Sequence, residues 1–120
     1  MNTIVIVFII NATLLILHEI ESAYWKEWEI LKLPGGITGF IVIHIPVLLL
    51  MLYGLVEVEK RSAAGNILSL VFGIVGLFPF VVHMLLVKKN DRFNLPISTV
   101  LLYANAVFGI LLLVLTVTQY

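Results

Sequence analysis

The chain has 120 residues, of which 62% are hydrophobic and only 12% charged, and its formal net charge is zero. A soluble domain carries about 25% charged residues, so this chain has too little polar surface to cover a water-soluble globule and is predicted to sit in a lipid bilayer. The balanced charge gives no basic surface for nucleic acid. The lack of cysteine excludes disulfides, thiolate metal sites and cysteine nucleophiles.

Four apolar segments are long enough to cross a bilayer core of about 30 Å, which needs roughly 20 helical residues. They run over about 3–24, 37–56, 63–87 and 96–118. The first has no basic start and no small-residue cleavage site, so it is expected to be retained rather than removed as a signal peptide. Short connections make consecutive helices antiparallel neighbours. The prediction is an all-α, integral membrane four-helix bundle, up-down-up-down, forming one domain over 1–120 with both termini on the same side.

Basic residues in the connections predict the orientation of this bundle, because cytoplasmic loops are enriched in lysine and arginine. The side with the first and third connections carries five of them, namely Lys26, Lys32, Lys88, Lys89 and Arg92. The side with the second connection and the termini carries only Lys60 and Arg61. Loops 25–36 and 88–95 are therefore predicted to be cytoplasmic, and the termini to lie outside.

Polar and small residues within the apolar segments recur at helical spacing, which predicts one protein-facing side for each helix. The third segment has small residues at intervals of three and four: Gly65, Ser69, Gly73 and Gly76. Such residues let helix backbones approach closely in lipid, so His83 on the same side is expected to face protein. Asn11, Ser22 and Asn105 are predicted to make polar contacts between helices.

The three histidines of the chain lie at similar depth from the predicted cytoplasmic side. At 1.5 Å per residue, His18 lies about 9 Å inside the end of the first helix, His44 about 11 Å after the start of the second, and His83 about 6 Å before the end of the third. Glu19 and Glu21 lie at or just outside this depth. Ionisable residues inside a membrane are costly, so they are functional candidates by default.

These residues predict a metal site formed by His18, His44 and His83 with Glu21 or Glu19, because imidazoles and carboxylates suit a Zn or Fe ion. With an open coordination position the site would support hydrolytic or redox chemistry. Ser22 stands where the second histidine of an HExxH motif would be, so no enzyme class and no catalytic residue is assigned.

Three other interpretations remain open. The histidines and acids could simply hydrogen-bond between helices. The chain could be a small proton- or ion-coupled carrier that acts as a homodimer. It could also be an accessory subunit of a larger membrane complex.

An aromatic cluster follows the first histidine. Tyr24, Trp25 and Trp28 are predicted to form an interfacial belt, because their rings combine an apolar body with a polar edge suited to the headgroup level. Helical spacing continues past these rings, so the first helix is expected to extend along the interface. Glu27 and Glu29 are then expected on its solvated face.

The run His18-Glu-Ile-Glu-Ser-Ala-Tyr-Trp-Lys-Glu-Trp-Glu29, followed by Leu33-Pro-Gly-Gly36, resembles an uncharacterised family of small four-helix prokaryotic membrane proteins. That family has a similar histidine–acid–aromatic stretch, a Leu-Pro turn and a later histidine where His83 stands. The resemblance spans most of the chain, although its specific part is 18–36. It implies the four-helix fold and a location in a prokaryotic inner or cell membrane, and it implies no reaction. It gives weight to the following residues: His18, Glu19, Glu21, Trp25, Glu27 and Trp28.

Overall fold

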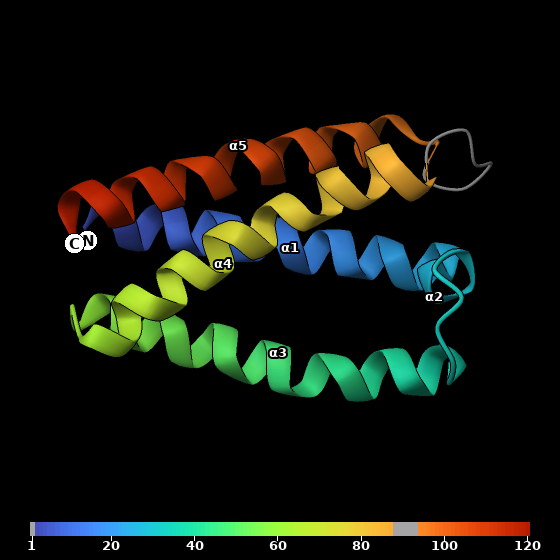
Figure 1. The fold of residues 1–120 in the computed structure, drawn as a ribbon, viewed down its shortest axis with the longest axis horizontal. Helices are drawn as coiled ribbons and strands as arrows, with labels where there is room; N and C mark the ends of the chain where they lie inside the picture. The colour runs from blue at the N-terminus through green and yellow to red at the C-terminus, as the bar shows by residue number, and fades with distance from the viewer. Residues whose placement is uncertain (1, 88–93) are drawn as a thin grey trace.

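The computed structural model describes residues 2–87 and 94–120. Its elements in chain order are α1 (Thr3–Trp25), α2 (Glu27–Ile30), α3 (Gly36–Glu59), α4 (Ala63–Val82), the π-helix η1 (His83–Val87) and α5 (Pro96–Gln119) (Figure 1). Four helical spans are long and apolar enough to cross a membrane: Thr3–Trp25, Gly36–Glu59, Ala63–Leu86 and Pro96–Gln119. The predicted all-α four-helix bundle is confirmed, and both termini lie at the same end (Figure 1). The expected topology charges Lys88, Lys89 and Arg92 fall outside the described residues.

Local chemistry explains where the helices begin and end. The side chains of Asn2 and Ser62 cap the first turns of α1 and α4, as expected for residues that accept hydrogen bonds from otherwise unpaired backbone N–H groups. Pro96 opens α5, where its missing N–H costs nothing. Lys26 ends α1 in the left-handed region at φ 55°. The chain therefore turns sharply there, and α2 folds back across the end of the bundle.

The helix α4 runs through the bundle and contacts α1, α3 and α5. Its glycines let α5 approach closely, because a Cβ built on Gly109 would lie 2.7 Å from the carbonyl oxygen of Gly73. Ser69 Oγ and Thr116 Oγ1 are 2.7 Å apart across the same contact. The predicted small-residue face of the third membrane helix is thus the one that packs against α5.

Two asparagines are buried in the interior of the bundle. Asn11 Nδ2 donates to the carbonyl oxygen of Phe72 at 2.9 Å, which links α1 to α4. Asn105 Nδ2 donates to the carbonyl oxygen of Leu101 at 3.1 Å, within α5 itself. Asn11 is therefore a contact between helices, whereas the hydrogen bond of Asn105 is local.

Tight packing and a loosely packed region occupy opposite ends of the molecule. The buried residues of α3 are Met51, Gly54 and Val58, all in its C-terminal half, and they join the apolar core beside Phe8 and Phe72. In contrast, α4 crosses diagonally away from α3 toward the start of α5 (Figure 1). The N-terminal half of α3, at the α2 end, is left mostly exposed.

Replacing Gly109 by Ala is expected to destabilise the bundle by about 1–3 kcal/mol, the usual cost of overpacking a tight contact. The added methyl group would meet backbone atoms of α4, which cannot move aside as a flexible side chain does. Reversible unfolding in mixed detergent micelles measures the effect. The control is Ile110→Ala, because Ile110 is 53% exposed on the surface of the bundle. Equal stability of the two variants would contradict the assigned α4–α5 contact.

Candidate metal centre

Two histidines and a glutamate converge at the α2 end of the bundle. One ligand atom from each of His18, Glu27 and His83 lies within 4.8 Å of the others. His83 Nε2 donates to Glu27 Oε1 at 3.1 Å, and His18 Nε2 lies 3.8 Å from Glu27 Oε2. The exposed fractions are only 2%, 8% and 4% in chain order. These three residues are called the His–Glu–His cluster below.

Three separate elements position this cluster. His18 lies on the protein-facing side of α1, one turn before Ser22. Glu27 is the first residue of α2 and points inward because the left-handed Lys26 reverses the chain. His83 begins η1, which follows Pro79 in α4. Short π-helical segments are rare and occur frequently at functional sites.

The hydroxyl group of Ser22 holds the carboxylate in place. Ser22 Oγ donates to Glu27 Oε2 and lies 3.3 Å from His18 Nε2. Burial raises the pKa of Glu27, but the hydrogen bonds from His83 and Ser22 and the adjacent imidazoles outweigh it, so this pKa lies below its ordinary value. Glu27 is therefore a carboxylate at neutral pH.

The donor set suits a divalent transition metal. Two imidazole nitrogens and one carboxylate oxygen are ligands typical of catalytic zinc sites and of non-haem iron. Ligand atoms about 2.1 Å from a tetrahedral ion lie about 3.4 Å apart. The two imidazoles lie 3.1 and 3.8 Å from the two oxygens of Glu27, and one donor atom of each residue lies within 4.8 Å of the others. Small side-chain movements would therefore bring the three donors onto one ion.

The other predicted ligands lie outside this cluster. His44 Nε2 is 2.7 Å from Glu19 Oε2, and its Nδ1 is 2.6 Å from the carbonyl oxygen of Phe40. Glu21 Oε2 accepts hydrogen bonds from Trp25 Nε1 at 3.2 Å and from Ser98 Oγ, which ties α1 to α5. The structure thus brings His18 and His83 together and pairs His44 with Glu19.

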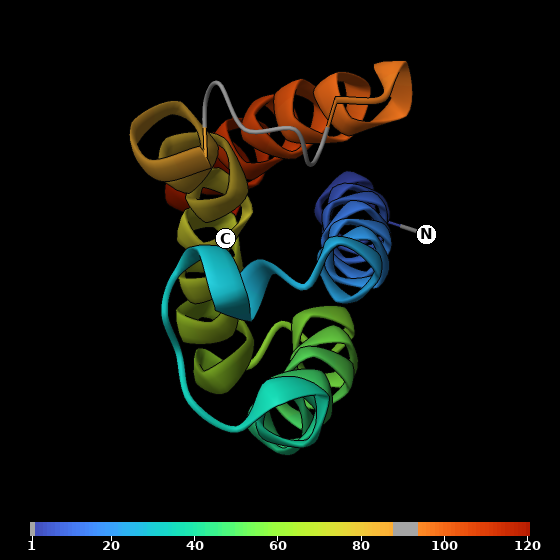
Figure 2. The same ribbon diagram turned by 90° about the vertical axis from the view of Figure 1, so that its right-hand side faces the viewer.

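A cavity of about 310 Å³ connects the two groups. His18 and Glu27 of the cluster line it, and so do Glu19 and His44. Figure 2 looks at this end of the molecule and shows α2 lying across the region between α1, α3 and α4. The remaining lining residues are apolar or aromatic, so the polar atoms are concentrated in one part of the wall.

The expected solvated position of Glu27 is wrong. Glu27 is buried and hydrogen-bonded, because α1 ends at Lys26 instead of continuing along the interface. No residue type in this stretch marks the break, since the left-handed position is a lysine rather than a glycine. The resemblance gave weight to Glu27 without indicating that its side chain turns inward.

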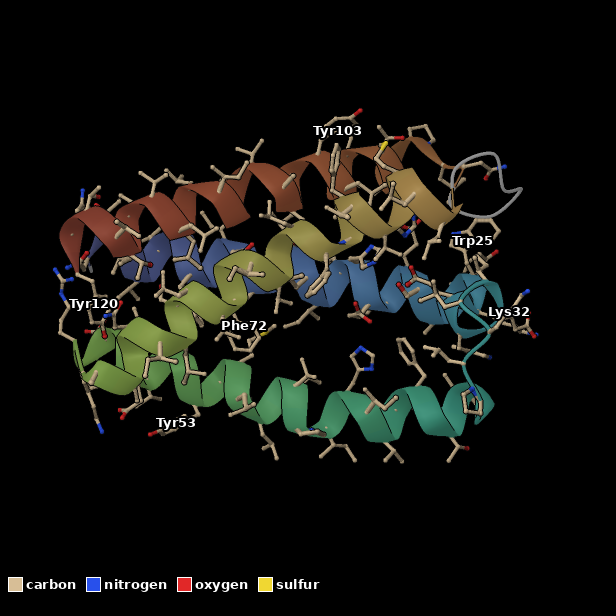
Figure 3. The ribbon with its side chains drawn as sticks, viewed as in Figure 1. Trp25, Lys32, Tyr53, Phe72, Tyr103 and Tyr120 are labelled. Atoms are coloured by element: carbon tan, nitrogen blue, oxygen red, sulfur yellow. The ribbon has the colours of Figure 1, made fainter. Side chains whose placement is uncertain are left out.

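The aromatic residues of the predicted belt have different surroundings. Tyr24 is 73% exposed, and Trp25 lies at the same end as Lys32, far from Tyr120 (Figure 3). Trp28 faces the cavity, with its ring centroid 5.4 Å from that of Phe40. The belt stays a prediction for Tyr24 and Trp25, whereas Trp28 has a second role as a cavity wall.

Residues 4–119 match a family described as a family of unknown function, DUF6713. The chain belongs to this family. The DUF6713 match includes all three members of the His–Glu–His cluster and nearly the full length of the four helices that are long and apolar enough to span a membrane. No curated protein and no solved structure matches the chain at a significant level.

Replacing Glu27 by Gln is expected to destabilise the protein by about 1.5–3 kcal/mol, the range for hydrogen bonds to a charged group. The matched control is Glu29→Gln, which removes the same charge from an exposed position of the same short helix. Because the folded-state pKa of Glu27 is lowered, its stabilisation is full above the ordinary pKa and is lost as the pH falls through the lowered one. Unfolding measured from pH 7 downward should show the two proteins converging in acid, and a constant difference would count against this role.

Proposed function

We propose that this protein is an integral membrane protein that binds one divalent Zn or Fe ion at His18, Glu27 and His83. The observation that supports this most directly is the convergence of three buried ligand atoms from α1, α2 and η1 within 4.8 Å. Burying ionisable groups inside a membrane protein is unfavourable unless they are paired or coordinate a metal. A bound ion would compensate this cost for all three groups together.

An ion bound at this site could act on a molecule in the neighbouring cavity. Three protein ligands leave a coordination position open, as in catalytic rather than structural metal sites. Because His18 and Glu27 also line the cavity, a molecule in the cavity could reach that position. When bound, such an ion polarises a carbonyl group or activates water, and hydrolytic chemistry on a membrane-embedded substrate is the function that we favour.

Removing a ligand should remove the metal. Protein purified without a His-tag is expected to carry about one Zn or Fe ion per chain, and His18→Ala or His83→Ala should abolish this content because a three-ligand site loses a donor. Ser22→Ala should weaken affinity about 10–100-fold, the usual effect of removing a partner that orients a ligand. Elemental analysis and competition with chelators measure both quantities.

The matched control for the metal experiment is His44→Ala. His44 is a histidine at the same end of the bundle, but it pairs with Glu19 and is not a member of the cluster. Its removal should leave the metal content unchanged. Wild-type protein without stoichiometric metal, or metal lost equally in His44→Ala, would contradict the proposed site.

We also propose that the metal site faces the cytoplasm of a prokaryotic cell, as the basic residues near α2 favour. The chain has no cysteine, so single cysteines can be labelled without background. In intact cells a membrane-impermeant maleimide should label Glu59→Cys, and it should label Glu29→Cys only after the membrane is permeabilised. Both positions are exposed glutamates at opposite ends of the bundle. The reverse pattern would place the site on the outer face.

A further inference from the structure

The cavity beside the His–Glu–His cluster has an apolar wall with few polar groups. Its volume of about 310 Å³ is at the lower end of the range of about 300–1,000 Å³ for ligand pockets. Its ionisable lining residues are His18, Glu19, Glu27 and His44, and in the part of the chain that the structure describes no lysine or arginine lines it. The wall therefore contains acids and imidazoles but no permanent cation, which makes it unsuited to an anionic ligand.

Most of these ionisable groups are engaged within the protein. Glu27 accepts hydrogen bonds at both carboxylate oxygens, from His83 and Ser22. His44 also uses both ring nitrogens, Nδ1 on a backbone carbonyl oxygen of α3 and Nε2 on Glu19 Oε2. The second oxygen of Glu19, Oε1, has no hydrogen-bond partner among the described residues, and this atom is not buried. Since Glu19 lines the cavity and its side chain is 34% exposed, Oε1 is the accessible acceptor of the wall.

This oxygen selects a ligand that donates a hydrogen bond. Glu19 Oε2 and His44 Nε2 are 2.7 Å apart, so one proton lies between them. Whichever of the two atoms carries that proton, Glu19 Oε1 has lone pairs and no hydrogen, and it can only accept a hydrogen bond. The requirement for a donor therefore depends neither on the ionisation state of Glu19 nor on an ion at the His–Glu–His cluster.

The number of donors identifies the polar group of the ligand more closely. A hydroxyl group has one O–H donor, an ammonium group has three N–H donors, and a carboxylate has none. A buried donor without an acceptor is costly, so an ammonium group would leave donors unpaired beside a single accessible acceptor. A carboxylate would face Glu19 Oε1 with another acceptor. One hydroxyl group is thus the best complement of this wall.

The cavity reaches the outer surface of the bundle between α3 and α4. Ile43 and Leu48 of α3 and Phe78 of α4 line it, and they are also 55%, 41% and 56% exposed. Both helices are long and apolar enough to span a membrane, so acyl chains would surround the opening. At about 30 Å³ for each water-sized group, the cavity of about 310 Å³ holds about ten such groups. This space is enough for a hydroxyl group and the first part of a hydrocarbon chain.

We propose that the cavity binds a long-chain primary alcohol from the bilayer, whose hydroxyl group donates a hydrogen bond to Glu19 Oε1. The first part of its chain packs against apolar lining residues of α3 and α4 such as Val47, Met51 and Val75, and the remainder leaves the bundle between these helices. This ligand class goes beyond the proposed metal function and does not rest on it, because the acceptor belongs to Glu19 and no ion is needed at the His–Glu–His cluster.

Tryptophan fluorescence tests the proposal directly. Trp28 lines the cavity and Trp25 is not among its lining residues, so Trp25→Phe protein reports on the cavity alone. In nanodiscs of unbrominated lipid, a long-chain primary alcohol brominated near its hydroxyl end should quench Trp28 saturably, and excess unbrominated alcohol should reverse the quenching. Trp28→Phe protein, which reports on Trp25, should show only weak quenching proportional to the bromine present. Linear or irreversible quenching of Trp28, or equal quenching in both proteins, would overturn the proposal.

Ligands that differ only at the polar end test the hydroxyl group. The methyl ether of the same brominated alcohol has no donor and should bind at least about 10-fold more weakly, because the acceptor is then left without a partner. The ionised carboxylic acid and the ammonium form of the amine, each of equal length, should also bind more weakly than the alcohol. Equal binding of the ether, or tighter binding of either charged ligand, would refute recognition of a single hydroxyl donor.

Two substitutions of Glu19 in the Trp25→Phe background test the assigned acceptor. Glu19→Leu removes both carboxyl oxygens and should abolish the preference for the alcohol over the ether. Glu19→Gln keeps an acceptor oxygen and supplies an N–H group for His44, so it should retain most of that preference. An unchanged preference in Glu19→Leu would refute the acceptor, and its loss in Glu19→Gln would refute recognition by hydrogen bonding without charge. If Glu19→Leu does not fold, the comparison of alcohol and ether decides.

Metal content measured on the same samples separates this proposal from the metal site. Protein treated with a chelator should still bind the alcohol saturably and prefer it to the ether. Stoichiometric metal without saturable quenching would refute the lipid proposal alone, whereas saturable quenching in protein that never carries metal would refute the metal site alone.

Discussion

The hydrogen bond from His83 to Glu27, 3.1 Å long, is the contact on which one end of this molecule depends. The helix α2 has four residues, too few to be stable alone, and Glu27 is its only buried residue. The same carboxylate also accepts a hydrogen bond from Ser22. The side chain of Glu27 thus links α2 to α1 and to η1, which follows α4. Since α2 covers the cavity, the fold and the site share this contact.

The opposite end is held by different forces. There the helices meet through glycines and apolar side chains, which suits a lipid environment in which packing rather than hydrophobic burial drives association. This close packing allows α3 and α4 to diverge toward the α2 end without loss of the bundle. Pro79 and η1 end α4 in the diverging region. The cavity is consequently a product of the helix geometry and does not require a separate domain.

The sequence predicts the fold far better than the site. Hydropathy and short connections determine four antiparallel helices, and depth along each helix places His18 and His83 at one level. The depth of a residue along a helix does not determine which way its side chain points around the helix axis. In α3, His44 is the one strongly polar residue between Thr38 and Tyr53, so no pattern of polar residues indicates which side of this helix faces protein. For that reason, the pairing of His44 with Glu19 could not be predicted. The resemblance gave weight to Glu27, but its buried position was not predicted, because the left-handed conformation of a lysine leaves no local pattern.

The distribution of polar groups favours binding at one face over transport through a single bundle. Within residues 2–87 and 94–120, the interior away from the site is filled by apolar side chains such as Phe8, Met51 and Leu112. Among the polar groups buried there, Ser69 and Thr116 are hydrogen-bonded to one another, and Asn11 and Asn105 donate to backbone carbonyl groups. They therefore offer no chain of ionisable groups from face to face, as a proton or ion pathway in one bundle would require. The ionisable groups that line the cavity belong to the site end, which is the arrangement expected if the proposed metal site binds its ligand at one end of the bundle.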